Sequence, residues 1–194
     1  MTHLHHNLDL LAARDRDLAA AVKSAAGGLL TIEPARNHVP SARRAGRWIH
    51  SAYDPLREAQ TWAAAHATAC QPGETVVVAG VGLLYHVEAL RNTLPPEVSL
   101  AVLISSLDEF HDALEARALE SWSESVLWLA GTPSEIAERL IQAGRPIRCL
   151  TYAPAAQPDA EFHCAFEEGL RRGISRQAGG QLTIALVGPI YGGS

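Results

Sequence analysis

The segment that most constrains the fold is residues 75–79, Thr-Val-Val-Val-Ala, which is followed at once by Gly80-Val-Gly82. A continuous run of β-branched and apolar residues is typical of a strand buried on both faces, as in a parallel sheet covered by helices. The two glycines allow a sharp turn, and a helical pattern opens at residues 84–94. The segment therefore predicts a strand, a glycine turn and a helix, in that order.

The same alternation of strands and helices continues along the chain. Asp54 and Pro55 form a helix start signal, because Asp can cap a helix and Pro suits its first turn. Alternating strands and helices predict an α/β fold: a Rossmann-like, doubly wound, mostly parallel sheet with helices on both faces, over residues 54–188. After the helix at 54–70, strands are expected at 98–104, 126–130, 147–152 and 182–187, and helices at 107–119, 133–143 and 159–177.

Residues 1–53 have a different pattern and predict a small α+β cap in front of the sheet. Leu and Val recur at near-helical spacing up to residue 24, and Gly27-Gly28 ends this helix. Short apolar runs broken by Pro and Gly predict a β-hairpin or meander over residues 29–50. Residues 189–194 are expected to begin a following module or linker, which would make the chain the N-terminal fragment of a larger protein.

The composition excludes several classes of protein. With 47% hydrophobic residues, a net charge of −5 and 3 cysteines, the chain is neither disordered nor a disulfide scaffold. It has no apolar run of the ~20 residues that span a membrane and no recognisable secretion signal, so we expect a cytoplasmic protein without membrane contacts. An isoelectric point of about 6.0 argues against nucleic-acid binding. The small basic clusters at residues 43–47 and 171–176 are interpreted as solvated faces.

Gly80 and Gly82 are the first candidates for ligand contact. At a strand-to-helix turn, their backbone amides can hold an anion such as a phosphate. His86, one helical turn further on, could act as a donor or proton carrier. Tyr85 stands where the dinucleotide fingerprint requires its third glycine, so the motif does not specify NAD. A tight turn that binds nothing remains the alternative.

The second predicted strand lacks the acidic residue that usually binds ribose hydroxyls in such folds. Ser105 and Ser106 occupy that place. Asp108 is the nearest carboxylate, and we expect it to cap the following helix. This departure weighs against a nucleoside site of the usual kind.

The segment at residues 49–59 is rich in polar side chains just before the predicted helix. Tyr53 and Arg57, like His50 and Ser51, have no evident structural need to be polar there. If the helix packs against the glycine turn, these groups could line the same pocket; bracing between cap and core is the alternative. The predicted ligand-binding residues are thus Gly80, Gly82, Tyr85, His86, Tyr53 and Arg57, while the catalytic residues and the cofactor are not specified.

Other reactive side chains give weaker signals. His3, His5 and His6 lie at the chain start, where we expect frayed residues rather than a metal site. Cys70, Cys149 and Cys164 form no CxxC pair and are expected in the core. We therefore predict no bound metal.

Two motifs together carry a resemblance to a known family. They are Ile-His-Ser-Ala-Tyr53-Asp-Pro-Leu-Arg57-Glu-Ala and the strand that runs into Gly80-Val-Gly82-Leu-Leu-Tyr85-His86. The pair resembles the N-terminal Rossmann-like domain of the motility accessory factors, which are bacterial flagellin glycosyltransferases. Those proteins are in turn similar to the 6-hydroxymethylpterin diphosphokinase family. The resemblance covers about residues 25–130.

The chain departs from this family in two ways. Ser105-Ser106 replaces the Glu-Pro that usually ends the second strand, and the chain end resembles the first strand and glycine turn of a GT-B-type module. The resemblance places the catalytic residues in a central domain, so none is carried onto this chain.

Three functions are compatible with these observations. The first is a non-catalytic accessory domain of a bacterial glycosyltransferase that binds or orients a nucleotide-linked donor, such as a nucleotide sugar, or a protein acceptor. Its partner would be a C-terminal glycosyltransferase module in the same chain. The second is a methyltransferase-like or pterin-diphosphokinase-like enzyme that binds a cofactor at Gly80-x-Gly82. The third is a protein-interaction or oligomerisation module that uses the cap and its arginines, for example in a homodimer.

Overall fold

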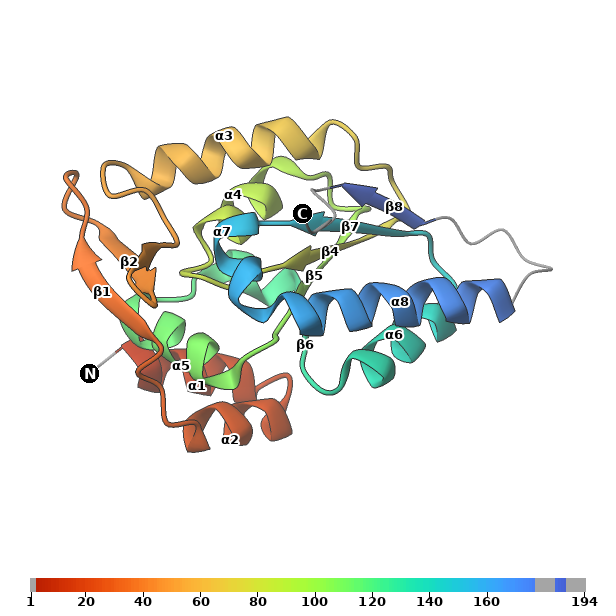
Figure 1. The fold of residues 1–194 in the computed structure, drawn as a ribbon, viewed down its shortest axis with the longest axis horizontal. Helices are drawn as coiled ribbons and strands as arrows, with labels where there is room; N and C mark the ends of the chain where they lie inside the picture. The colour runs from red at the N-terminus through yellow and green to blue at the C-terminus, as the bar shows by residue number, and fades with distance from the viewer. Residues whose placement is uncertain (1–2, 177–183, 188–194) are drawn as a thin grey trace.

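The computed structural model describes residues 3–176 and 184–187 and has a central sheet with helices on each side (Figure 1). The sheet has five parallel strands in the order β6-β5-β4-β7-β8. The strands are β4 (Thr75–Ala79), β5 (Ser99–Leu103), β6 (Val126–Leu129), β7 (Ile147–Thr151) and β8 (Ile184–Val187). This confirms the predicted α/β, Rossmann-like, doubly wound architecture.

The two faces of the sheet bury two separate cores. Val76 and Val78 of β4 face one core, and Val77 and Ala79 face the other, as the alternation of a strand requires. Residues 75–79 form a continuous run of β-branched and apolar residues because both faces of β4 are buried. The first core is covered by α3 (Pro55–Ala67), α4 (Tyr85–Thr93) and α5 (Leu107–Ala116), and the second by α6 (Pro133–Gln142) and α8 (Ala160–Arg176).

The N-terminal part contains two helices, not the single helix that the sequence predicted. They are α1 (His3–Ala12) and α2 (Arg16–Ser24). Asp15 interrupts the helical pattern because its carboxylate accepts a hydrogen bond of 2.9 Å from the Leu18 N–H and caps α2. Both helices pack against α5, where the buried Asn7 side chain donates to the Leu114 carbonyl at 2.7 Å.

The predicted hairpin or meander is present as a separate antiparallel sheet. Its strands are β1 (Leu30–Pro34), β2 (Pro40–Arg44) and β3 (Arg47–Trp48). The residues before β1 are tied to α5, since the Asp112 carboxylate accepts from the N–H groups of Gly28 and Leu30. The division of the chain at residue 53 stays a prediction.

Several predicted boundaries differ from those of the structure. Helix α3 ends at Ala67 rather than near residue 70, and α5 ends at Ala116 rather than 119. Ser106, and not Asp108, caps α5, because Ser106 accepts from the Glu109 N–H; Asp108 instead accepts from the Ala26 and Gly27 N–H groups. Three short helical turns were not predicted: η1 (Ser121–Ser125), α7 (Ala153–Ala156) and η2 (Gln157–Asp159).

Some predictions fall on residues outside the described part. These are the last residue of the helix at 159–177, the first two of the strand at 182–187, and the module or linker at 189–194. Of the helices that the structure describes, none is both long enough and apolar enough to span a bilayer.

Candidate functional site

The glycine loop, residues 80–84, follows β4 at the carboxyl edge of the parallel sheet. Strand order reverses between β4 and β7, with Ala79 paired to Leu103 on one side and to Thr151 on the other. Open α/β sheets bind ligands outside the carboxyl ends of their strands at such a reversal. This edge is therefore the first place to search for a functional site.

Both glycines of the loop are required by close packing of the chain on itself. A Cβ on Gly80 would lie 2.8 Å from the Tyr152 carbonyl oxygen and 2.9 Å from the Ala156 nitrogen. A Cβ on Gly82, which has φ +48°, would lie 2.6 Å from His50 Nε2. The Gly-x-Gly pattern thus has a structural cause at the positions where a ligand would approach the backbone.

The amides of the loop are already engaged by side chains of the protein. The Gly82 N–H donates to Glu109 Oε1 at 2.8 Å, and the Leu83 N–H donates to His50 Nε2 at 2.7 Å. All residues of the loop are buried. An anion could reach these donors only by displacing Glu109 and His50.

Arg44 of β2 occupies the space beside Glu109. Its guanidinium donates to Glu109 Oε2 at 2.5 Å and to both carboxylate oxygens of Asp159 at 2.9 and 2.7 Å. The Ser105 hydroxyl donates to Asp159 Oδ2 at 2.7 Å. We call Arg44, Gly82, Ser105, Glu109 and Asp159 the carboxyl-edge cluster.

Burial and ion pairing act against each other in this cluster. Burial raises the pKa of Glu109, and the Gly82 N–H and Arg44 oppose that shift. Burial also opposes ionisation of Asp159, yet the hydrogen bonds from Arg44 and Ser105 hold its pKa below the usual value. Only 2% of the Glu109 side chain and 14% of the Arg44 side chain are exposed, so the ion pair is largely shielded from water. The cluster binds the cap to the sheet.

A second buried network joins His50 to α3. His50 Nε2 accepts from Leu83, so its proton lies on Nδ1, 3.1 Å from the Tyr152 hydroxyl. That hydroxyl donates to Glu58 Oε2 at 3.0 Å. Burial lowers the pKa of His50 well below 6.5 and raises that of Tyr152, so both groups are neutral. The Ile49 carbonyl also lies 3.0 Å from the Tyr152 hydroxyl, so two acceptors share its single proton.

His86 lies beneath the glycine loop and is fully buried. Its Nε2 donates to the Gly80 carbonyl at 2.9 Å, and its ring stacks on Tyr152 with the centroids 4.0 Å apart. No described residue hydrogen-bonds to its Nδ1. Burial lowers the pKa of His86 to about 3, so the ring is neutral near pH 7. In this arrangement its side chain supports the loop from below.

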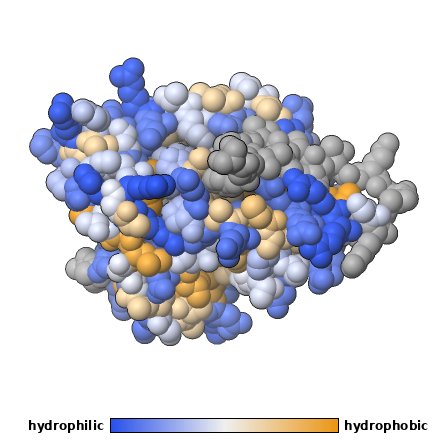
Figure 2. Space-filling view, viewed as in Figure 1, coloured by the Kyte–Doolittle hydropathy of each residue, from blue (hydrophilic) through white to orange (hydrophobic). Residues whose placement is uncertain are grey.

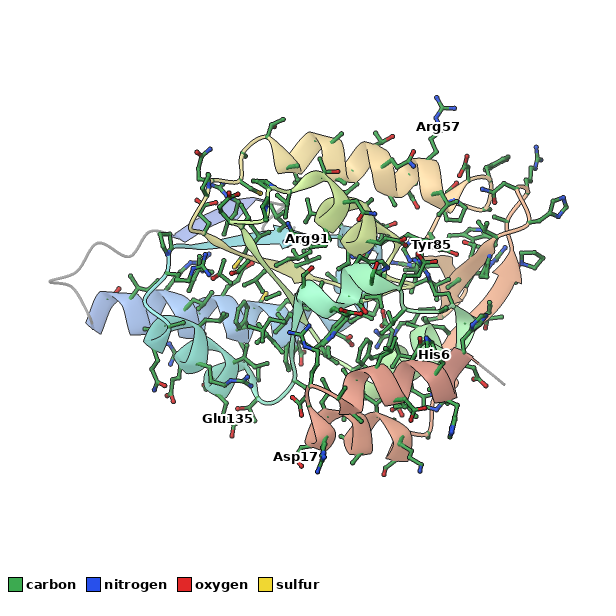
Figure 3. All side chains as sticks on the ribbon, turned by 180° about the vertical axis from the view of Figure 1, so that it is seen from behind. His6, Asp17, Arg57, Tyr85, Arg91 and Glu135 are labelled. Atoms are coloured by element: carbon green, nitrogen blue, oxygen red, sulfur yellow. The ribbon has the colours of Figure 1, made fainter. Side chains whose placement is uncertain are left out.

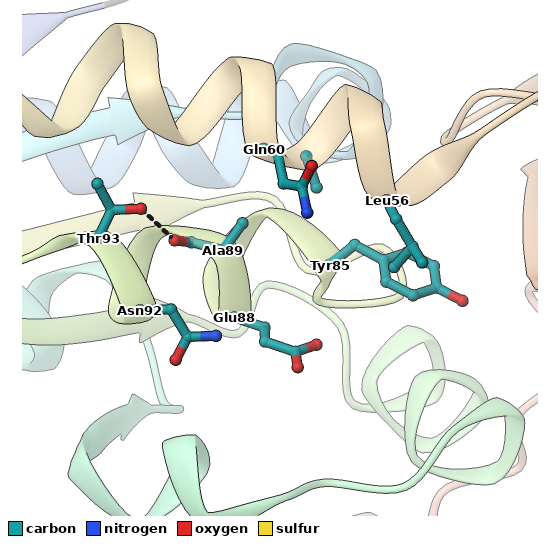
Figure 4. A pocket seen from close by; sticks show the side chains of 8 residues that line it. Leu56, Gln60, Tyr85, Glu88, Ala89, Asn92 and Thr93 are labelled. Atoms are coloured by element: carbon teal, nitrogen blue, oxygen red, sulfur yellow. Dashed lines mark hydrogen bonds between the residues drawn. The ribbon is translucent and has the colours of Figure 1, made fainter.

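The other predicted ligand-binding residues lie apart from the glycines. The Tyr85 hydroxyl donates to the Pro40 carbonyl at 2.9 Å, and Tyr85 lines a groove of about 320 Å³ between α3 and α4 (Figure 4). Tyr53 and Arg57 are exposed and line a different groove, of about 590 Å³. Figure 3 shows Arg57 pointing away from the protein body, whereas Tyr85 lies inside. The six residues therefore occupy three places, and whether any of them binds a ligand stays a prediction.

Sequence reasoning missed Arg44, Glu109, Asp159 and Tyr152. Glu109 and Asp159 had one available signal, since each lies close to the first turn of a helix that follows a parallel strand. An acidic residue was expected at the end of β5, where the chain has Ser105-Ser106 instead. Glu109, on the following helix, nevertheless places a carboxylate beside the glycine loop. Arg44 belongs to the cluster at residues 43–47 that was interpreted as a solvated face, and for Arg44 this interpretation is wrong: its side chain is 14% exposed and bonds Glu109 and Asp159, which are distant in the sequence.

The remaining candidates are also resolved. His3 begins α1, so the predicted fraying of residues 3–6 is wrong. Cys70 and Cys149 are buried as expected, but Cys164 is exposed on α8. Within residues 3–176 and 184–187, no three His, Cys, Asp or Glu side chains are arranged to hold a metal ion.

The fold and this edge define the class of the protein: a Rossmann-like α/β fold in which Arg44 of β2 and His50 pack at the carboxyl edge of the parallel sheet. No protein-family profile and no curated protein matches the chain. Among solved structures, it is similar to the MAf glycosyltransferase from Magnetospirillum magneticum AMB-1, with a TM-score of 0.60 and 11% identity. That match covers 88% of this chain and 34% of the glycosyltransferase chain.

A second solved structure, MNMC2 from Aquifex aeolicus, matches with a TM-score of 0.41 and 13% identity, over 87% of this chain and 70% of that one. At such a score the similarity does not define a common fold. The first match shows a shared fold, and this chain spans about a third of the length of that glycosyltransferase. The predicted family resemblance is thus supported at the level of the fold.

Proposed function

We propose that this chain is a non-catalytic accessory domain of a larger glycosyltransferase-like protein. In this role it orients a substrate for a catalytic module elsewhere. Of the two substrates expected from the sequence, the proposal favours the protein acceptor over the nucleotide-linked donor. The fold shared with the MAf glycosyltransferase supports this choice of parent protein.

One observation carries the proposal: the donors of the glycine loop are bound internally. Glu109 accepts from Gly82 and His50 accepts from Leu83, at distances of 2.8 and 2.7 Å. A nucleotide phosphate at a helix N-terminus needs such N–H groups free and directed at it. Because both are satisfied by buried side chains, binding a nucleotide would require breaking good hydrogen bonds before making new ones.

The second candidate is an enzyme that binds a cofactor at this edge, as a methyltransferase-like or pterin-diphosphokinase-like domain would. One observation favours it: Glu109 supplies a carboxylate next to the glycine loop, where nucleotide-binding folds of this type hold ribose hydroxyls. A phosphate bound by the loop would require Glu109 and His50 to release the N–H groups of Gly82 and Leu83.

A thermal-shift screen of the chain tests the proposal. The panel contains nucleotide sugars, ATP, NAD and S-adenosylmethionine, and the proteins are the natural chain and its His50→Ala variant, which frees the Leu83 N–H. A ligand at about 100 times its dissociation constant adds about 2.7 kcal/mol to the free energy of unfolding. For a chain of this size that is roughly a 5–10 °C shift of the melting temperature.

We expect no shift of the natural chain with any member of the panel. A shift in the natural chain would contradict the proposal and favour the cofactor-binding enzyme. A shift seen only with His50→Ala would support it, because it would identify His50 as the group that keeps nucleotides from the loop amide.

A further inference from the structure

The glycine loop has a strained backbone that its neighbours must hold in place. Leu84, at the end of the loop, has φ +64° and is fully buried, and Gly80 and Gly82 have φ +97° and +48°. A residue with a side chain is strained in this left-handed region and stays there only where surrounding contacts hold it. The contacts made to the loop therefore decide whether it keeps this conformation.

His50 provides the contact next to the strained residue, because its Nε2 accepts from the Leu83 N–H at 2.7 Å. Burial, together with His86 and Arg117, lowers the pKa of His50 well below 6.5, so its ring carries a single proton. A neutral imidazole has one nitrogen that donates and one that accepts. Leu83 is therefore held only while the ring proton of His50 lies on Nδ1 and not on Nε2.

Tyr152 and Glu58 determine which nitrogen of His50 carries that proton. His50 Nδ1 lies 3.1 Å from the Tyr152 hydroxyl and 3.8 Å from Glu58 Oε2. The hydroxyl proton can go to Glu58 Oε2 or to the Ile49 carbonyl, each at 3.0 Å, or to Nδ1 when Nδ1 is unprotonated. A negative carboxylate attracts both the hydroxyl proton and a proton on Nδ1, so it favours the form of the ring that holds Leu83.

Glu58 is also the place where these contacts reach the surface. Its side chain is 35% exposed, against 1% for His50. We call the groove of about 590 Å³ along α3 the α3 groove; its lining includes Tyr53, Arg57, Glu58, Trp62 and His66. Figure 2 shows hydrophilic residues on the surface where the β1–β2 turn meets the start of α3. A change of charge at Glu58 can therefore be imposed from solvent, while its effect is felt at the buried loop.

We propose that Glu58 controls the glycine loop through Tyr152 and His50, which we call together the Glu58 switch. In the held state, Tyr152 donates to the Glu58 carboxylate, His50 Nδ1–H donates to the Tyr152 oxygen, and Nε2 accepts from Leu83. When the charge of Glu58 is neutralised, the Tyr152 hydroxyl turns to donate to Nδ1, and the ring proton exchanges through water from Nδ1 to Nε2.

His50 and Tyr152 each keep one proton in both states, so only the direction of the hydrogen bonds changes. In the second state two donors, Nε2–H and the Leu83 N–H, would face each other across the 2.7 Å that now separates the two nitrogens. Two donors at that distance repel, so the ring and the loop separate and the Leu83 N–H becomes free. Release also relieves the strain at Leu84.

This inference rests on the proposed function for its premise that protein side chains hold the donors of the loop. It adds a condition under which one donor is released. Among the described residues, Glu109 makes no hydrogen bond to the Glu58 switch, so it should keep the Gly82 N–H in both states. The Gly82 amide is therefore an internal reference for Leu83.

Nitrogen-15 NMR of the full chain tests the held state. The imidazole shifts of His50, assigned by comparison with a His50→Ala variant, report which ring nitrogen is protonated. We expect a protonated Nδ1 and an unprotonated Nε2 in the natural chain at about pH 7. Protonation of Nε2 there would overturn the proposal, because Leu83 would have no acceptor.

Glu58→Gln tests the switch, since it removes the charge and keeps the shape of the side chain. We expect His50 Nε2 to be protonated in this variant. The hydrogen-exchange protection of the Leu83 amide, relative to that of Gly82, should fall by about tenfold or more. Glu168→Gln makes the same change in an exposed ion pair with Arg172 and should leave this ratio within about twofold.

Tyr152→Phe gives a second route to the same measurement if Glu58→Gln does not fold. It keeps the ring stacked on His86 and removes the hydroxyl to which His50 Nδ1–H donates, so the Leu83 ratio should fall here as well. The proposal is overturned if the ratio stays within about twofold of its natural value in the variants that fold, or if Gly82 loses protection to the same extent. A nucleotide-induced shift of the natural chain would contradict the proposed function but change neither NMR result.

Discussion

The carboxyl-edge cluster and the α3 groove contain similar side chains in opposite states. Arg44 is 14% exposed and bonded to two carboxylates, whereas Arg57 is exposed and forms no ion pair within the described residues. Tyr152 is buried with its hydroxyl bonded to Glu58, whereas Tyr53 is 59% exposed. The loop amides at the sheet edge where this fold usually binds ligands are thus hydrogen-bonded to protein side chains, whereas Tyr53 and Arg57 are exposed to solvent.

The two regions should therefore respond differently to mutation. A buried ion pair that loses one partner leaves an uncompensated charge in a medium of low dielectric constant, which strongly destabilises the folded state. An exposed side chain without partners contributes little to stability, and its loss is felt only when a ligand binds.

The largest effect is expected from Arg44→Ala. It removes the only guanidinium that the described structure places between Glu109 and Asp159 and should cost about 3–5 kcal/mol of unfolding free energy. The neighbouring Arg43→Ala is the matched control: Arg43 is 36% exposed and pairs with Glu33 at 3.4 Å, so its loss should cost about 1 kcal/mol or less. Urea denaturation measures both, and equal losses would remove the contrast between the two regions.

The next effect is expected from Gly82→Ala. Its φ of +48° disfavours a side chain, and the new Cβ would lie 2.6 Å from His50 Nε2, which is held by Leu83. Strain and overpacking together should cost about 2–4 kcal/mol. Gly46→Ala, at φ +78° with nothing within 4 Å of its Cβ, should cost only the backbone strain, about 1–2 kcal/mol. If the two variants have the same thermal stability, the loop is less tightly packed than its geometry implies.

Lowering the pH should reduce the free energy of unfolding, because the folded protein buries histidines in the neutral form. The pKa of His86 is lowered by burial to about 3 in the folded state, against 6.5 ordinarily. Between these values the unfolded chain binds a proton that the folded protein excludes, so stability is constant above about pH 6.5 and falls as the pH drops toward 3. By about pH 5 the loss from this group should be about 2 kcal/mol. Burial similarly lowers the pKa of His163, to about 4.

The variant His86→Phe measures the share of His86 in this pH dependence. Phe keeps an aromatic ring against Tyr152 but binds no proton, so the fall in stability between pH 7 and about pH 5 should shrink by about 2 kcal/mol. Urea midpoints at the two pH values give the answer. An unchanged slope would mean that His86 becomes protonated in the folded protein and is not shielded as its burial suggests.

The smallest effect on stability is expected from Tyr53→Ala. The ring is 59% exposed and contacts the Arg36 guanidinium at the surface, so the unfolding free energy should stay within about 0.5 kcal/mol of that of the natural chain. Circular dichroism during urea denaturation is sufficient for this test. A loss of about 2 kcal/mol or more would show that Tyr53 braces the cap, and the α3 groove would then resemble the carboxyl-edge cluster.

The elements of the sheet were predictable because their signals are local. The run at residues 75–79 is β4 within its predicted bounds, and Asp54 caps α3 as its Asp-Pro signal indicated. The sequence predicted a single N-terminal helix in place of α1 and α2, because Asp15 lies between apolar residues whose spacing is nearly helical. A side chain that caps a helix and one that merely lies on its polar face look alike without the backbone dihedrals.

The candidate site was predicted less well, for a reason of distance. The loop itself was found, but the side chains that bind it come from far along the chain. Glu109 accepts from Gly82, 27 positions away, and His50 accepts from Leu83, 33 positions away. Arg44 lies 115 positions from its partner Asp159. A glycine turn that awaits a ligand and one that packs on its own protein require the same residues at the same spacing.

Local patterning was enough to specify the parallel sheet, its glycine turn and the order of strands and helices, because each of these depends on residues a few positions apart. Whether the N–H groups of that turn face a ligand or a protein side chain depended on which side chains the folded chain brings to it. Long-range packing placed His50 and Glu109 against the loop and left Tyr53 and Arg57 in solvent. A ligand could use the loop donors only by replacing hydrogen bonds that the protein already makes.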